Sequence, residues 1–154
     1  MVPDAAPPPL PQPLQRLVTL FASSPKDIKV HALVDYSNRL ADPPRHLIDE
    51  HALARVPECQ TPFFVAVELD TDERVALHFD VPRESPTIRG YAGILADGLN
   101  GLPAAEVLAV PDNFYVRMGL EEVLTPLRLR GMGAIIAAVK SLVRSQLDQR
   151  AAAK

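Results

Sequence analysis

The sequence predicts an α+β domain in which helices pack on one face of a small antiparallel sheet. Apolar residues recur at helical spacing up to residue 40, form an apolar run over 63–69, alternate with polar residues over 75–80, and return to helical spacing from 88 onward. Helical spacing marks one buried face of a helix, and alternation marks a strand with one buried face. Helices, then strands, then helices is the order typical of an α+β domain.

The ends of the chain set the expected domain boundaries. Residues 1–13 contain six prolines, which predicts a flexible, polyproline-like leader that joins no helix or sheet. Terminal segments of this kind usually have no function of their own, although a proline-reading module could also bind this one. Residues 14–148 form the expected single domain, and 149–154, which are small or polar, are expected to fray.

Two helices are expected before the strands. The first covers 14–21 and the second about 25–40, each with apolar residues at helical spacing. Ser24 followed by Pro25 is the pattern of an N-cap with proline at the first helical position. Two prolines after residue 42 end the second helix, and a linker-like stretch is expected from there to residue 57.

The expected sheet contains two strands and a tight connection. Residues 63–69 form an apolar run, and in 75–80 apolar residues alternate with polar ones. The polar residues 70–73 between them predict a hairpin turn, so the two strands are expected to be antiparallel. Pro82 and Pro86 end the sheet region.

Helical spacing covers the rest of the chain. The expected elements are a helix from Ile88 to Leu99 closed by Asn100-Gly101, a short helix over 103–110, a turn capped by Asp112 and ended by Gly119, and a long last helix that opens at Thr125-Pro126.

Composition excludes several classes of function. The chain has 154 residues, a size typical of one domain, and a net charge of −3, which argues against a broad polyanion-binding face. Its single cysteine excludes an internal disulfide and fits a reducing compartment. No apolar run is long enough to cross a bilayer, and the first residues lack the features of a signal peptide. We therefore expect a cytoplasmic protein.

No metal or phosphate site is expected from the motifs. The histidines lack the paired spacing of zinc ligands, and Cys59 has no CxxC partner. The glycines at 90, 93 and 98 lie inside a helix, so they form no phosphate-binding loop, and those at 131 and 133 are explained by close packing. The four histidines are His31, His46, His51 and His78.

The function of the chain depends mainly on Cys59. This thiol lies before an expected strand and shortly after Pro57, which favours a loop that can present sulfur to another molecule. The alternative is packing, because a free cysteine is among the most buried residue types. A cysteine-dependent hydrolase with a histidine base is a further alternative, although no hydrolase motif surrounds Cys59.

The motif around Cys59 resembles a known family. Residues 56–61 read VPECQT and resemble the VPGCQS motif of the SufE family, the sulfur acceptors of cysteine desulfurases. Three other segments are similar to SufE motifs: TIRG at 87–90, PAAEVL at 103–108 and GLEEVLTPLR at 119–128, followed by GM at 131–132. The resemblance covers about 14–147. The chain departs from the family at Glu58, which replaces a glycine, at Pro62, Phe64 and Arg130, and at Leu127, which replaces a serine.

The resemblance implies a function, a fold and a set of site residues. A SufE-like protein has the α+β fold shared with IscU-like cluster scaffolds. It takes sulfur from a pyridoxal-phosphate cysteine desulfurase, stimulates that enzyme, and delivers the sulfur to an iron–sulfur cluster scaffold. Cys59 would carry the persulfide, while Gln60, Glu84, Arg89 and Arg128 would form the docking face. The protein would be a sulfur-transfer accessory rather than a stand-alone catalyst, and it would need no cofactor of its own.

The single thiol also bears on the choice between carrier and scaffold. A second thiol nearby would attack a persulfide and release sulfide, whereas iron–sulfur clusters typically take four cysteine ligands. One cysteine therefore favours a carrier over a scaffold. A regulator that binds and stimulates a desulfurase without taking sulfur is an alternative. Such a protein would retain stimulation after Cys59→Ser.

Overall fold

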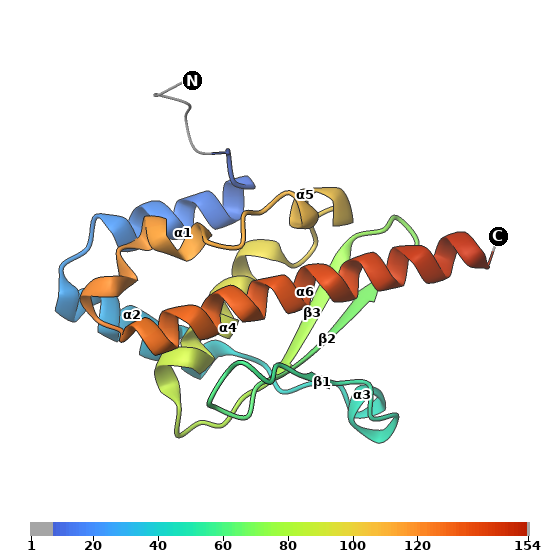
Figure 1. Ribbon diagram of the computed structural model, residues 1–154, viewed down its shortest axis with the longest axis horizontal. Helices are drawn as coiled ribbons and strands as arrows, with labels where there is room; N and C mark the ends of the chain where they lie inside the picture. Colours follow the sequence, from blue (N-terminus) through green and yellow to red (C-terminus); the bar gives the residue numbers. More distant parts are fainter. Residues whose placement is uncertain (1–7, 154) are drawn as a thin grey trace.

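The computed structural model describes residues 8–153 and combines helices with one small sheet (Figure 1). The elements follow the order α1 (Gln12–Ala22), α2 (Lys26–Arg39), α3 (Arg45–Asp49), β1 (Ala54–Arg55), β2 (Phe64–Leu69), β3 (Val75–Asp80), α4 (Pro86–Leu99), α5 (Ala104–Leu108), the 3₁₀ helices η1 (Phe114–Met118) and η2 (Leu120–Glu122), and α6 (Pro126–Ala152). Among the described residues, no helix is both long and apolar enough to cross a membrane.

The sheet is antiparallel throughout and has the order β1-β2-β3. Along β2 and β3 the inward-facing residues Val65, Val67, Leu77 and Phe79 are buried. Helix α6 packs against β2 and helix α4 against β3, so the large helices cover one face of the sheet (Figure 1). The predicted α+β class, with an antiparallel sheet and helices on one face, is confirmed.

Helices α2 and α4 cross at very close range. A Cβ built on Gly90 would lie 2.2 Å from the backbone oxygen of Leu33. A glycine at this position therefore lets the two backbones meet, which a larger residue would prevent. The contact fixes the start of α4, and the start of α4 supplies one wall of the site described below.

The first and the last helix are both longer than the sequence predicted. Helix α1 begins at Gln12 and includes Pro13 in its first turn, where a proline is tolerated because its missing N–H needs no helical partner. Residues 1–7 of the expected leader lie outside the described residues. Helix α6 continues through Ala152, where fraying was expected. Alanines favour the helix, and the Arg150 guanidinium donates a hydrogen bond to the Leu69 carbonyl on β2.

The stretch expected to be a linker contains two short elements. Helix α3 follows Pro44, and Leu47 anchors it because this side chain is buried. Strand β1 then pairs with the first residues of β2. Five helical residues are too few to give a periodic signal in the sequence, which explains why this helix was not predicted.

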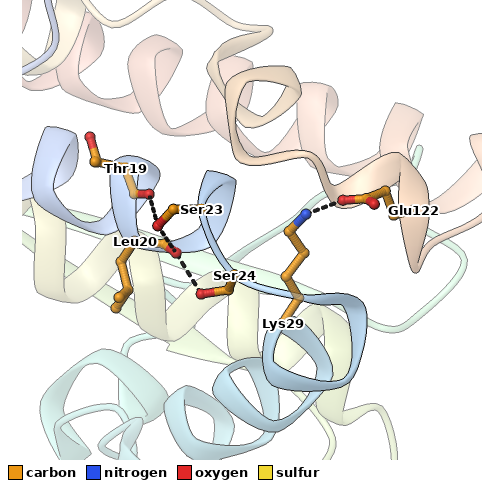
Figure 2. A network of polar contacts seen from close by, with 6 residues as sticks. All are labelled: Thr19, Leu20, Ser23, Ser24, Lys29 and Glu122. Atoms are coloured by element: carbon orange, nitrogen blue, oxygen red, sulfur yellow. Dashed lines mark hydrogen bonds and ion pairs between the residues drawn. The ribbon is translucent and has the colours of Figure 1, made fainter.

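Ser24 does not cap α2. Its hydroxyl donates a hydrogen bond of 2.6 Å to the Leu20 carbonyl, so it closes α1 instead, as Figure 2 shows. The same view contains a buried lysine. Lys29 on α2 pairs with Glu122 on η2, just before α6 begins (Figure 2). The Lys29 side chain is only 2% exposed. Its ion pair with Glu122 ties α2 to the segment that leads into α6.

Candidate functional site

Cys59 lies on the loop that connects β1 to β2. A hydrogen bond of 2.9 Å from the Val56 N–H to the Phe63 carbonyl joins the two ends of this loop. The Cys59 N–H donates to the Val56 carbonyl at 3.2 Å, which folds 56–59 into a turn. The flanking residues Glu58 and Gln60 are exposed, yet Cys59 is only 4% exposed. The Cys59 side chain is therefore turned inward while its two neighbours in the loop face solvent.

Below the loop is a small cavity of about 30 Å³. Three parts of the chain enclose it: the loop itself, the first turn of α4, and the first two turns of α6. The lining residues are Cys59, Gln60, Thr61, Ile88, Leu127, Arg128 and Gly131. Leu127 and Gly131 are one helical turn apart on α6, so both face the same side.

The electrostatics of the cavity favour a neutral thiol at rest. Burial raises the pKa of Cys59 above its ordinary value, because a thiolate loses hydration there. A hydrogen bond from the Thr61 backbone N–H and the positive charges of Arg128 and Arg55 act in the opposite direction on this pKa. The net shift is upward, so the thiolate needed for nucleophilic attack is scarce until the loop opens.

This raised pKa predicts the pH dependence of alkylation. Since only the thiolate reacts, the rate of Cys59 modification by iodoacetamide is expected to be low at neutral pH. It should continue to rise beyond the pH at which the reaction of free cysteine levels off. Arg128→Ala removes a neighbouring positive charge, so the pH at which the alkylation rate is half its maximum should move further upward. Intact-mass kinetics over a pH series measures this rate, and a midpoint below that of free cysteine contradicts the described electrostatics.

Arg128 and Gln60 both border the cavity and are exposed, as a docking role requires. Arg128 lies in the first turn of α6, where its N–H donates to the capping Thr125 hydroxyl at 3.3 Å. Its guanidinium donates to the Thr87 hydroxyl at 3.4 Å. The start of α6 thus carries a positive charge to the mouth of the Cys59 cavity.

Glu84 and Arg89 have different environments. Glu84 is exposed in the turn before α4 but does not line the cavity. Arg89 is 4% exposed. Its guanidinium donates to three backbone carbonyls, of Ser37 at 3.0 Å, Val81 at 2.7 Å and Leu40 at 3.1 Å. This corrects the expectation of a docking residue, because all its donors point into the protein and hold α4 against the end of α2.

The sequence motifs did not identify the apolar side of the cavity. Ile88, Leu127 and Gly131 line the cavity with Cys59, although none carries a reactive group. Leu127 is 41% exposed, which places it at the rim of the cavity. The spacing of four between Leu127 and Gly131 indicates a shared helix face, but nothing in the sequence indicates that the loop packs on it.

Histidines contribute to a separate cluster on the sheet. Glu68 accepts hydrogen bonds of 2.9 Å from both His46 and His78, which lie on α3 and β3. The Glu68 hydrogen bond raises the pKa of His46. Within residues 8–153, no group of three or more His, Cys, Asp or Glu side chains is arranged to hold a metal ion. The residues that line the Cys59 cavity include no histidine.

Comparisons with known proteins agree with this architecture. The family model "SufE: Fe-S metabolism associated domain" matches residues 15–143. A SufE-like protein of Mycobacterium tuberculosis, found in strains CDC 1551 and H37Rv, is 47% identical over 139 residues, covering 90% of this chain and 96% of the relative. SufE-like protein 1 of Arabidopsis thaliana, chloroplastic/mitochondrial, is 30% identical over 128 residues, which cover 80% of this chain and 32% of that protein.

A solved structure is also similar along nearly the whole chain. The solution structure of a hypothetical protein from Thermus thermophilus superposes with a TM-score of 0.82 and 41% sequence identity. The superposition covers 91% of this chain and 99% of that one.

Proposed function

The chain belongs to the SufE family and has an accessory sulfur-transfer role in Fe–S metabolism. We propose that Cys59 accepts persulfide sulfur from a cysteine desulfurase. In this proposal the chain stimulates the desulfurase by removing its sulfur, and it passes that sulfur to an iron–sulfur cluster scaffold. The observation that carries the proposal is the position of the only thiol. It lines a small cavity beside a cation, on a loop in which the neighbouring residues Glu58 and Gln60 are exposed.

The proposed transfer is a thiol–persulfide exchange. The Cys59 thiolate attacks the outer sulfur of the donor's persulfide, so a new S–S bond forms on Cys59 and the S–S bond of the donor breaks. The donor cysteine leaves as a thiolate, and the proton stays on the transferred sulfur. No external oxidant or reductant is needed. The pyridoxal phosphate that generates the sulfur belongs to the partner enzyme.

The buried resting position requires the loop to open for transfer. Apart from the turn bond between the Cys59 N–H and the Val56 carbonyl, one hydrogen bond in the described structure joins 57–62 to the rest of the protein, from the Thr61 hydroxyl to that of Ser85 at 3.4 Å. A segment with so few bonds opens at low free-energy cost. Opening exposes the sulfur to a docked partner and removes the burial that raises the pKa of Cys59.

Arg128, Gln60 and Glu84 form the proposed docking face around the loop. Interface arginines are often binding hot spots, and losing one costs more than about 1 kcal/mol. We therefore expect Arg128→Ala to raise the concentration giving half-maximal desulfurase stimulation by about fivefold or more. Arg144→Ala is the matched control, because Arg144 is also exposed on α6 but does not line the cavity. Equal effects of the two variants would contradict a docking role for Arg128.

Intact-mass spectrometry tests the proposed function. After incubation with a cysteine desulfurase and L-cysteine, the chain should gain one sulfur, ~32 Da, which a reductant removes and which Cys59→Ser lacks. No adduct under conditions in which the desulfurase turns over contradicts the carrier role. Stimulation without an adduct would favour the non-carrier regulator instead. A cysteine-dependent hydrolase requires a histidine near the nucleophile, and no histidine lines this cavity.

A reducing compartment such as the cytoplasm suits this chemistry. One free cysteine stays reduced there and is ready to accept sulfur. The absence of a second cysteine from the sequence also means that the chain itself holds no thiol that could resolve its own persulfide.

A further inference from the structure

We infer that the free edge of β2 binds an extended, basic segment of a partner protein, which continues the sheet where β1 stops. Strand β1 pairs with the first part of β2 alone, at Phe64 and Val65. Strand β2 itself continues to Leu69. The incoming segment therefore lies opposite residues 66–69. This inference does not depend on the sulfur chemistry of Cys59.

The pairing pattern determines which backbone groups of β2 point to this edge. In an antiparallel ladder, successive residues of a strand direct their N–H and C=O groups to opposite neighbours. The Asp70 N–H donates to the Arg74 carbonyl across the hairpin at 3.1 Å, so the even-numbered residues of β2 bond to β3. The Val56 N–H donates to the Phe63 carbonyl from the β1 side, which agrees with this alternation. Val67 therefore directs both its N–H and its C=O to the free edge.

These edge groups lack partners. In the described part of the chain, neither backbone group of Val67 has a hydrogen-bond partner. A longer β1 would place Ala52 opposite, but the Ala52 N–H donates to the Leu47 carbonyl at 2.9 Å and closes α3 instead. The Leu69 N–H points to the same edge, while the Leu69 carbonyl already accepts from Arg150. Another chain can add to such a row of unpaired donors and acceptors as a further strand.

The free edge opens onto a cavity of about 370 Å³. Besides β2 itself, α6 and the segment from α3 to the start of β1 line this cavity, with the residues Leu47, Glu50, Ala52, Leu142, Ser145, Gln146 and Gln149. The side-chain amides of Gln146 and Gln149 can each donate to and accept from a peptide backbone. Because α3 and α6 both line the cavity, it suits a single extended segment rather than the edge of another folded sheet.

The charge of the cavity favours a basic segment. The described residues that line it include two carboxylates, Glu50 and Glu68, and no lysine or arginine. Glu68 is shared with His46 and His78, but the Glu50 carboxylate forms no ion pair in the described part of the chain. A lysine or arginine on the incoming segment supplies that partner. The proline-rich leader of this chain does not meet the requirement, because residues 1–13 contain no lysine or arginine.

The alternation of side chains also constrains the sequence of the segment. Val67 points to the inner face of the sheet, which α6 covers, and Glu68 points to the outer face, where His46 of α3 bonds to it. The side chains of a paired segment alternate in the same way. The residue opposite Val67 must therefore be small enough to fit against α6, while its two neighbours project beside the carboxylates. A segment in which lysine and alanine alternate meets both conditions.

An NMR titration of the full chain tests the inference. The probe is the peptide acetyl-Lys-Ala-Lys-Ala-Lys-amide, and its matched control has glutamate in place of each lysine. The amide protons of Val67 and Leu69 should shift downfield as their new hydrogen bonds form. Those of Ala66 and Glu68 should shift far less, because both residues already pair with β3. The titration also gives the Kd of each peptide.

A pair of variants tests the role of charge. Glu50→Gln removes one carboxylate from the cavity, and Asp49→Asn is its matched control, because Asp49 is exposed on α3 but does not line the cavity. At low ionic strength the Kd of the lysine peptide should rise about threefold in Glu50→Gln and stay unchanged in Asp49→Asn.

Four results would overturn the inference. They are the absence of a shift at Val67, equal shifts at Ala66 and Glu68, equally tight binding of the glutamate peptide, and equal effects of the two variants. Shifts at Val67 that appear on concentrating the chain alone would also overturn it, because they assign the edge to a second copy of this chain. None of these measurements involves a desulfurase, so they are independent of the proposed function.

Discussion

Replacing Cys59 by serine is expected to return desulfurase turnover to its unstimulated rate. A serine hydroxyl forms no persulfide, so the variant has no atom onto which the donor's sulfur can move. Turnover is followed as alanine or sulfide production with increasing amounts of the chain. Full loss of stimulation, rather than a partial decrease, is the expected result, because Cys59 is the only thiol in the sequence.

Two controls separate chemistry from folding and docking in this experiment. Serine places a hydroxyl in a cavity that has both polar and apolar walls. Burying it costs about 1–3 kcal/mol at most, so thermal unfolding should still be cooperative. The variant should also compete with the parent chain for the desulfurase, since the docking side chains Arg128 and Gln60 are unchanged. Stimulation retained by Cys59→Ser contradicts the carrier role and favours the regulator.

Replacing Arg89 by methionine is expected to cause the largest loss of stability among the side chains discussed. Methionine keeps the length of the side chain but leaves the carbonyls of Ser37, Val81 and Leu40 without their donors. Because buried polar groups without partners are costly, the free energy of unfolding should fall by roughly 3–5 kcal/mol. This is a large share of the ~5–15 kcal/mol typical of a domain. Chemical denaturation measures the loss.

Arg83→Met is the matched control for that prediction. Arg83 is also an arginine near the start of α4, but its side chain is 67% exposed and its 3.9 Å ion pair with Asp42 lies in solvent. Exposed pairs contribute little, so this variant should change the free energy of unfolding by less than about 0.5 kcal/mol. Equal losses in the two variants would show that Arg89 does not support the fold in the described way.

Local pattern was enough to predict most of the fold. The alternation in β3, the helical spacing of α4 and the Thr125-Pro126 start of α6 all depend on near neighbours in sequence, and the structure has these elements. Helix α3 has too few residues to produce a periodic pattern. Ser24 carries the residue type of an N-cap, but its hydroxyl bonds back to the preceding helix. Residue type alone does not distinguish these two uses.

The site was only partly predictable, for a different reason. The motif identified Cys59 and Arg128 because these positions are close to other recognisable residues. Whether a side chain is buried depends on distant segments. The carbonyls that accept from Arg89 include those of Ser37 and Leu40, which lie 52 and 49 residues away in sequence. The wall formed by Leu127 and Gly131 likewise depends on how the loop folds onto α6.

The most direct measurement is a single-turnover transfer from a desulfurase that already holds one persulfide, with no free cysteine present. The masses of both proteins are recorded over time. The desulfurase is expected to lose ~32 Da as this chain gains ~32 Da on the peptide containing Cys59, at equal rates. A desulfurase that keeps its sulfur in the presence of the bound chain, or that loses it only as free sulfide, would contradict direct transfer to Cys59.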